Sequence, residues 1–107
     1  MTKSSFKRNT YTYKEVLELV HTNLCGPIEV QSYEGDRYIM FFVDDYSRMM
    51  NIMFLKKESD KFQMFKWYLA RVEKETKMSL KCLRLDRGGK FTSKEFETFF
   101  NDKGIKR

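Results

Sequence analysis

Several signals that mark other protein classes are missing from this sequence of 107 residues. No apolar run reaches the roughly 20 residues that a membrane-spanning helix needs. The first residues lack the apolar core of a signal peptide. No segment repeats, and none is of low complexity. These absences predict a soluble, intracellular protein with no membrane partner.

Cysteine is also scarce, because Cys25 and Cys82 are the only two. Their spacing matches no metal-binding motif, and two thiols do not make the disulfide framework of a small secreted domain. We interpret both as buried, apolar thiols of a protein in a reducing compartment.

Apolar and charged residues are both plentiful. Hydrophobic residues make up 41% of the chain and aromatic residues 16%, which are values of a folded domain. The length suffices for one domain with a core. The net charge of +6 is compatible with a polyanionic partner such as nucleic acid. Lysine-rich surfaces are, however, often only solvated.

The chain divides into two parts by composition. Residues 1–14 are polar and basic and show no hydrophobic period. We predict that they form a linker or arm, ordered only when a partner holds it. Residues 15–107 carry the periodic apolar pattern of a single folded domain.

The first half of this domain contains three short apolar segments that end at turn signals. They predict strands over Leu17–Leu24, Arg37–Val43 and Met49–Leu55. Short connections between consecutive strands predict an antiparallel meander. A helical turn over Lys14–Val20 is the alternative for the first segment, but Val20 and Thr22 favour extended structure. Residues 28–30 would extend that strand raggedly.

The hydrophobic period then changes to that of a helix. Four apolar residues fall on one helical face, namely Phe62, Phe65, Leu69 and Val72. They predict a helix that ends near Thr76. Ser59 is a suitable N-cap. Trp67 and Tyr68 lie beside this stripe, and we interpret them as widening it.

A fourth strand is predicted over Leu80–Asp86, where two glycines end it. Asp86 would then stand at the carboxyl end of a strand, where α/β sheets often place their chemistry. The alternative is an aspartate that only begins a turn, which is a common use of this residue.

A second helix follows this strand. Thr92 and Glu95 have the spacing of a capping box. Three phenylalanines share one face, namely Phe96, Phe99 and Phe100. Gly104 is suited to end the helix, and residues 105–107 resemble the start of a further strand. The predicted order is therefore β-β-β-α-β-α.

Three sequence words in this order carry a resemblance to a known family. They are HTNLCGP at His21–Pro27, VDDYSR at Val43–Arg48 and LRLDRGGKFTSKEF at Leu83–Phe96. Over about residues 16–107 the chain resembles the integrase catalytic core of copia-type long-terminal-repeat retrotransposons, a retroviral-type integrase within the ribonuclease H-like superfamily. The resemblance implies an internal part of a Pol polyprotein. It also implies an α/β fold with a ribonuclease H-like mixed sheet, truncated at the start of its fifth strand.

The resemblance implies metal-dependent DNA integration, by 3′-end processing and strand transfer. Such integrases hold two Mg²⁺ or Mn²⁺ ions with two aspartates and one glutamate, and these hard cations prefer oxygen ligands. Asp86 stands where the family has its second acid, and Asn23 stands where it has its first. The third acid would belong to a helix beyond the carboxyl terminus.

Asn23 departs from the family pattern, and so does Lys90, where the family usually has an acid. An amide oxygen brings no negative charge, so Asn23 and Asp86 together would bind a cation weakly or not at all. We therefore expect the chain to be inactive as given. The alternative function is a non-catalytic nucleic-acid-binding or interaction module derived from an integrase.

The remaining polar residues of these words have simpler interpretations. Asp44 and Asp45 would be turn or hairpin residues, and His21 an ordinary strand residue. Three basic residues could contact DNA phosphates, namely Arg87, Lys90 and Lys94. They are equally suited to a solvated surface. The family implies DNA and other integrase protomers as partners, and the nucleus or a virus-like particle as the compartment.

Overall fold

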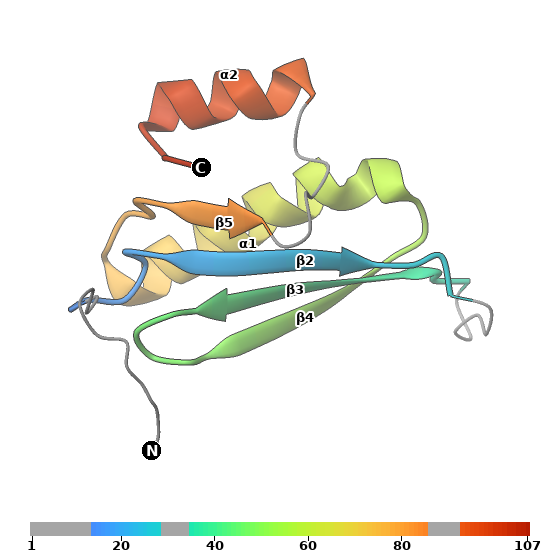
Figure 1. The fold of residues 1–107 in the computed structure, drawn as a ribbon, viewed down its shortest axis with the longest axis horizontal. Helices are drawn as coiled ribbons and strands as arrows, with labels where there is room; N and C mark the ends of the chain where they lie inside the picture. Colours follow the sequence, from blue (N-terminus) through green and yellow to red (C-terminus); the bar gives the residue numbers. More distant parts are fainter. Residues whose placement is uncertain (1–13, 29–34, 86–92) are drawn as a thin grey trace.

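A four-stranded mixed sheet forms the centre of the protein (Figure 1). The computed structural model describes residues 14–28, 35–85 and 93–107. Its strands are β2 (Val20–Cys25), β3 (Tyr38–Asp44), β4 (Met50–Leu55) and β5 (Leu83–Leu85). They lie in the order β4-β3-β2-β5. The β2–β3 and β3–β4 pairs are antiparallel and β2–β5 is parallel, which confirms both the meander and the mixed α/β sheet.

The first strand begins later than predicted. Leu17 has a φ of 66° and lies in a turn, so the strand starts at Val20 and not at Leu17. The backbone N–H of Leu17 donates to the Asp44 carboxylate at 2.6 Å. This contact between residues distant in the sequence holds the segment out of the sheet. The other two strands of the meander each begin one residue later than predicted.

Helix α1 spans Lys61–Thr76 and follows a 3-10 turn at Glu58–Asp60. Its N-cap is Asp60, so the prediction of Ser59 was wrong, because the 3-10 turn occupies that position. The Tyr68 ring is buried and stacks on Phe42 with ring centroids 4.1 Å apart. Trp67 is 51% exposed, so only Tyr68 widens the apolar stripe.

Strand β5 is shorter than predicted, since Leu80 and Lys81 precede it without joining the ladder and Asp86 lies outside the described residues. An isolated parallel bridge links Cys82 to Lys106. Its hydrogen bonds join Leu83 N–H to the Lys106 carbonyl at 2.8 Å and Lys106 N–H to the Lys81 carbonyl at 2.9 Å. The predicted start of a fifth strand is thus present as this single bridge.

Helix α2 spans Lys94–Lys103. Its N-cap is Ser93, whose hydroxyl accepts from the Phe96 N–H at 3.3 Å. The predicted capping box beginning at Thr92 was therefore wrong by one residue, and Thr92 itself lies outside the described residues. Gly104 ends the helix with a φ of 71°, as predicted.

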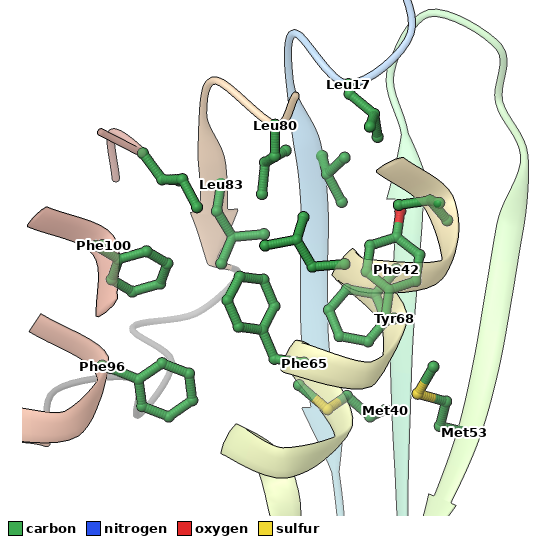
Figure 2. Packing of buried hydrophobic residues seen from close by; sticks show 14 of the residues in the cluster. Leu17, Met40, Phe42, Met53, Phe65, Tyr68, Leu80, Leu83, Phe96 and Phe100 are labelled. Carbon is green, nitrogen blue, oxygen red and sulfur yellow. The ribbon is translucent and has the colours of Figure 1, made fainter. Parts of the chain in front are cut away.

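One hydrophobic core joins the sheet to both helices. Residues of the buried face of the strands alternate with residues of the opposite face, as a pleated sheet requires. In Figure 2 the Phe65 ring of α1 lies between the strands and the α2 rings. Its centroid is 6.0 Å from that of Phe96 and 5.6 Å from that of Phe100. The Phe65 ring therefore packs α1 against α2 on the core side of the sheet.

Candidate functional site

Asn23 lies on β2, on the face of the sheet opposite the core. Its neighbours Val20 and Thr22 are buried, and strand alternation places Asn23 on the other side, where it is half-buried. Its side-chain amide nitrogen donates to the Cys25 sulfur at 3.8 Å. The residue therefore presents an amide with one N–H directed along its own strand.

The parallel pairing of β2 and β5 brings the sequence word that begins at His21 beside the word that begins at Leu83. The described register pairs Val20 with Leu83, His21 with Arg84 and Thr22 with Leu85. Asn23 is the next residue of β2 after the last of these pairs. Asp86 follows Leu85 in the sequence and lies outside the described residues, so the proximity of these two residues stays a prediction.

The three predicted phosphate contacts are only partly described. Arg87 and Lys90 lie outside the described residues. Lys94 is exposed in the first turn of α2. It borders an open groove of about 520 Å³ whose other lining residues are Phe62, Glu95, Thr98, Phe99 and Asp102. The groove combines aromatic rings with charges of both signs, so it gives no electrostatic preference for phosphate.

His21 makes a contact that sequence reasoning missed. Its Nε2 atom lies 3.0 Å from Oδ1 of Asp45, and both side chains are about one-third exposed. Asp45 directly follows β3, and the antiparallel register sets His21 opposite Val43. That register, once assigned, would have placed the two side chains near each other. His21 therefore makes a side-chain contact on the face of the sheet opposite the core, and is more than an ordinary strand residue.

Asp44 organises the β3–β4 connection. Its carboxylate is buried and accepts from Leu17 N–H at 2.6 Å and from Ser47 N–H at 2.7 Å. Its carbonyl accepts from Arg48 N–H at 2.8 Å. These bonds confirm the interpretation of Asp44 as a hairpin residue. Burial, and to a lesser degree the Asp44 charge, raises the pKa of the Tyr68 hydroxyl well above its ordinary value.

The described residues do not form a metal site. Within residues 14–28, 35–85 and 93–107, no group of three or more histidine, cysteine, aspartate or glutamate side chains is placed to hold an ion. Asn23 contributes an amide oxygen without charge. This donor set does not fit a pair of divalent cations, which need several carboxylate oxygens.

The cysteines differ from the prediction in one respect. Cys25 and Cys82 are free thiols, and both are partly exposed and not buried. Cys25 is the last residue of β2, and Cys82 directly precedes β5. Among the described residues, neither helix has the length and apolar character to cross a membrane.

The fold and its sequence words define a class of protein. Residues 14–107 match the family model of the integrase core domain, and the chain belongs to this family. It is similar to the retrovirus-related Pol polyprotein from transposon TNT 1-94 of Nicotiana tabacum, with 40% identity over 102 residues. That match covers 95% of this chain and 8% of the polyprotein. The chain is therefore an integrase core segment related to retrotransposon Pol polyproteins.

Proposed function

We propose that this segment derives from a copia-type retrotransposon integrase core, which in its intact and active form inserts element DNA by 3′-end processing and strand transfer, and that the chain as given is inactive. The observation that carries the proposal is the parallel pairing of Thr22 with Leu85. Asn23 and Asp86, which follow these two residues, stand at the positions of the first two acids of the family. Residues at the same level of adjacent parallel strands project from the same face of the sheet, so we expect Asn23 and Asp86 to lie side by side.

Asn23 is the reason to expect no activity from the chain as given. Integrase cores generally use a divalent metal. We propose that this metal is Mg²⁺ or Mn²⁺ in the intact family, and that its binding at Asn23 and Asp86 is weak or absent in this chain. The Asn23 amide adds no charge, and its nitrogen donates to the Cys25 sulfur.

A second candidate function is that of a non-catalytic nucleic-acid-binding module. The uncharged Asn23 side chain favours the absence of catalysis, and the net charge of +6 favours nucleic-acid binding.

The proposed partners are DNA and other integrase protomers. DNA would meet the basic residues after β5, namely Arg87, Lys90 and Lys94, together with the basic arm of residues 1–14. Contacts of this kind neutralise phosphates and release counterions, so the affinity should be independent of base sequence and should fall steeply as salt rises. The proposed compartment is the nucleus or a virus-like particle.

Calorimetric titration with Mg²⁺ and Mn²⁺ tests the ligand positions. Asn23→Asp should bind either ion at least about tenfold more tightly than the parent chain, because a charged ligand replaces a neutral one. Asn101→Asp is the matched control, since it adds the same charge on the exposed surface of α2.

The gain in Asn23→Asp should disappear when Asp86→Ala is added. Equal affinities for Asn23→Asp and Asn101→Asp would contradict the assignment of this position. A gain that survives Asp86→Ala would contradict the assignment of Asp86 while leaving that of Asn23 in place.

A further inference from the structure

The end of the sheet where β2 and β5 begin carries a group of basic side chains. Two described segments that meet there, residues 76–82 and 103–107, hold five of the 21 lysines and arginines of the chain and none of its 15 aspartates and glutamates. In Figure 1 the arrowheads of β2 and β5 point away from this end. All five basic residues are exposed, and we refer to them as the basic end: Lys77, Lys81, Lys103, Lys106 and Arg107.

Backbone and side-chain hydrogen bonds hold these segments together. The Lys106 N–H donates to the Lys81 carbonyl at 2.9 Å, and the Leu83 N–H donates to the Lys106 carbonyl at 2.8 Å. The Glu73 carboxylate accepts from the Leu80 N–H at 2.8 Å, which ties the last turn of α1 to the segment before β5. The end of α1, the start of β5 and the residues after α2 therefore form one continuous surface.

Three acidic side chains lie close to the basic end, and their charges remain. Glu15 lies 3.7 Å from Lys81 in an exposed pair, which is a weak interaction in water. Glu73 is the carboxylate that accepts from the backbone before β5. Asp102 precedes Lys103 and lines the groove between α1 and α2. Five basic groups with these three acids still leave a local net charge of +2.

The composition of this surface favours a nucleic-acid backbone over a lipid surface. Peripheral membrane binding usually combines basic residues with apolar side chains that enter the lipid. The large apolar side chains that are exposed among the described residues lie within residues 46–54 and at Trp67, and none lies within 76–82 or 103–107. A phosphate backbone, in contrast, is bound by charge alone.

The basic end is separate from the proposed ligand positions. Lys106 pairs with Cys82, which stands one level before the pair of Val20 with Leu83. Asn23 therefore lies four residues further along the strands than Lys106, about 13 Å at roughly 3.3 Å per residue. A phosphate held by Lys106 is thus a different phosphate from one at Asn23.

We propose that the basic end binds the phosphate backbone of DNA as a second contact surface, at the opposite end of the sheet from the basic residues after β5. This inference rests on the proposed function, which makes DNA a partner. The side chains of the basic end neutralise phosphates and do not read bases, so the contact is independent of base sequence. It holds a part of the DNA that lies away from the ligand positions.

Fluorescence anisotropy at a series of salt concentrations tests the proposal, with a labelled DNA duplex of about 20 base pairs as the probe. Lys103→Gln with Lys106→Gln should lower the affinity of the intact chain at least about fivefold at low salt. The slope of log affinity against log salt should become shallower by about 2, because each phosphate contact contributes about 0.9. Lys56→Gln with Lys57→Gln is the matched control, since it removes the same charge at exposed positions after β4. Its slope should change by less than about 0.5.

A charge-preserving variant separates lost charge from a disturbed fold. Lys103→Arg with Lys106→Arg keeps both positive charges and should retain the affinity and the slope of the parent chain. Thermal unfolding of each variant measures whether the segment after α2 still packs. A loss that occurs with glutamine and not with arginine is then a loss of phosphate contacts.

Three outcomes would overturn the proposal. Equal slopes in the Lys103 and Lys106 glutamine variant and in the Lys56 and Lys57 control would overturn this inference alone and leave DNA as the partner. No duplex binding by the parent chain would overturn both this inference and the proposed DNA partner. Vesicles of phosphatidylserine and phosphatidylcholine that outcompete the duplex, and that lose their affinity in the same glutamine variant, would assign the basic end to a lipid surface.

Discussion

The backbone N–H of Leu17 donates to Oδ1 of Asp44 at 2.6 Å, across 27 positions of sequence. Leu17 is buried and has a φ of 66°. A left-handed conformation is unfavourable for leucine, so the hydrogen bond and the burial of the side chain must maintain it. The same carboxylate accepts from Ser47 N–H. Asp44 thus connects the segment before β2 to the β3–β4 hairpin.

Replacement of Asp44 should therefore destabilise the fold. Asp44→Asn keeps the size of the side chain but presents an N–H group where the carboxylate accepts a hydrogen bond. We expect the free energy of unfolding to fall by about 2 to 3 kcal/mol, because a charge-assisted bond is lost and a buried donor is left unpaired. Urea denaturation measures the change. Asp102→Asn, at an exposed position of α2, should change stability by less than about 0.5 kcal/mol, and equal losses in both variants would contradict the role of Asp44.

Tyr68 predicts a change of stability at high pH. Burial, followed by the Asp44 charge, raises the pKa of its hydroxyl above the ordinary value of 10.0. The folded protein then keeps this proton at a pH where the unfolded chain releases it. The contribution is fully present below pH 10 and is lost as pH rises from there toward the higher pKa of the folded state.

The comparison with Tyr68→Phe isolates this contribution, because the other tyrosines and lysines titrate in both proteins. The difference in unfolding free energy between parent and variant should be constant below pH 10 and should shift in favour of the variant above it. Urea titrations from neutral pH to about pH 11 measure this difference. A difference that stays constant over the whole range would show that Tyr68 ionises equally in both states.

The caps of the two helices provide a third prediction. Ser93 caps α2 through a hydrogen bond from Phe96 N–H, whereas Ser59 lies inside the 3-10 turn and makes no cap. Ser93→Ala should lower the free energy of unfolding by about 1 kcal/mol. Ser59→Ala is the matched control and should have an effect of less than about 0.5 kcal/mol. Thermal unfolding of both variants checks this, and a larger loss in Ser59→Ala would mean that the helix begins where the sequence pattern had placed it.

The order and type of the elements could be predicted because they follow from local patterns. Period-two segments gave the meander, and the helical spacing of Phe65, Leu69 and Val72 identified α1. The beginnings of elements were less predictable. Leu17 has a sequence suited to a strand, but the distant Asp44 carboxylate fixes it in a turn. Ser59 and Thr92 both have cap-forming side chains, and the adjacent Asp60 and Ser93 are the residues that serve as N-caps.

Some features of the candidate site could be predicted from the sequence, and others depend on contacts between distant segments. The position of Asn23 follows from its sequence word and from the alternation of β2, so its place on the face opposite the core was within reach of the sequence. The pairing of His21 with Asp45 depends on the β2–β3 register, which the sequence alone does not specify. Cross-strand pairs such as Phe41 with Ile52 likewise become neighbours only in the β3–β4 register.

A strand-transfer assay on an extended integrase tests the central claim most directly. The protein would be this chain continued through the segment that carries the family's glutamate, with either Asn23 or Asn23→Asp, and with Mg²⁺ or Mn²⁺. The proposal places Asn23 at the first ligand position, where it supplies no carboxylate, so it predicts no joined DNA product with Asn23 and clear product with Asn23→Asp. Divalent-dependent DNA cleavage by the 107-residue chain itself, abolished by Asp86→Ala, would contradict the account.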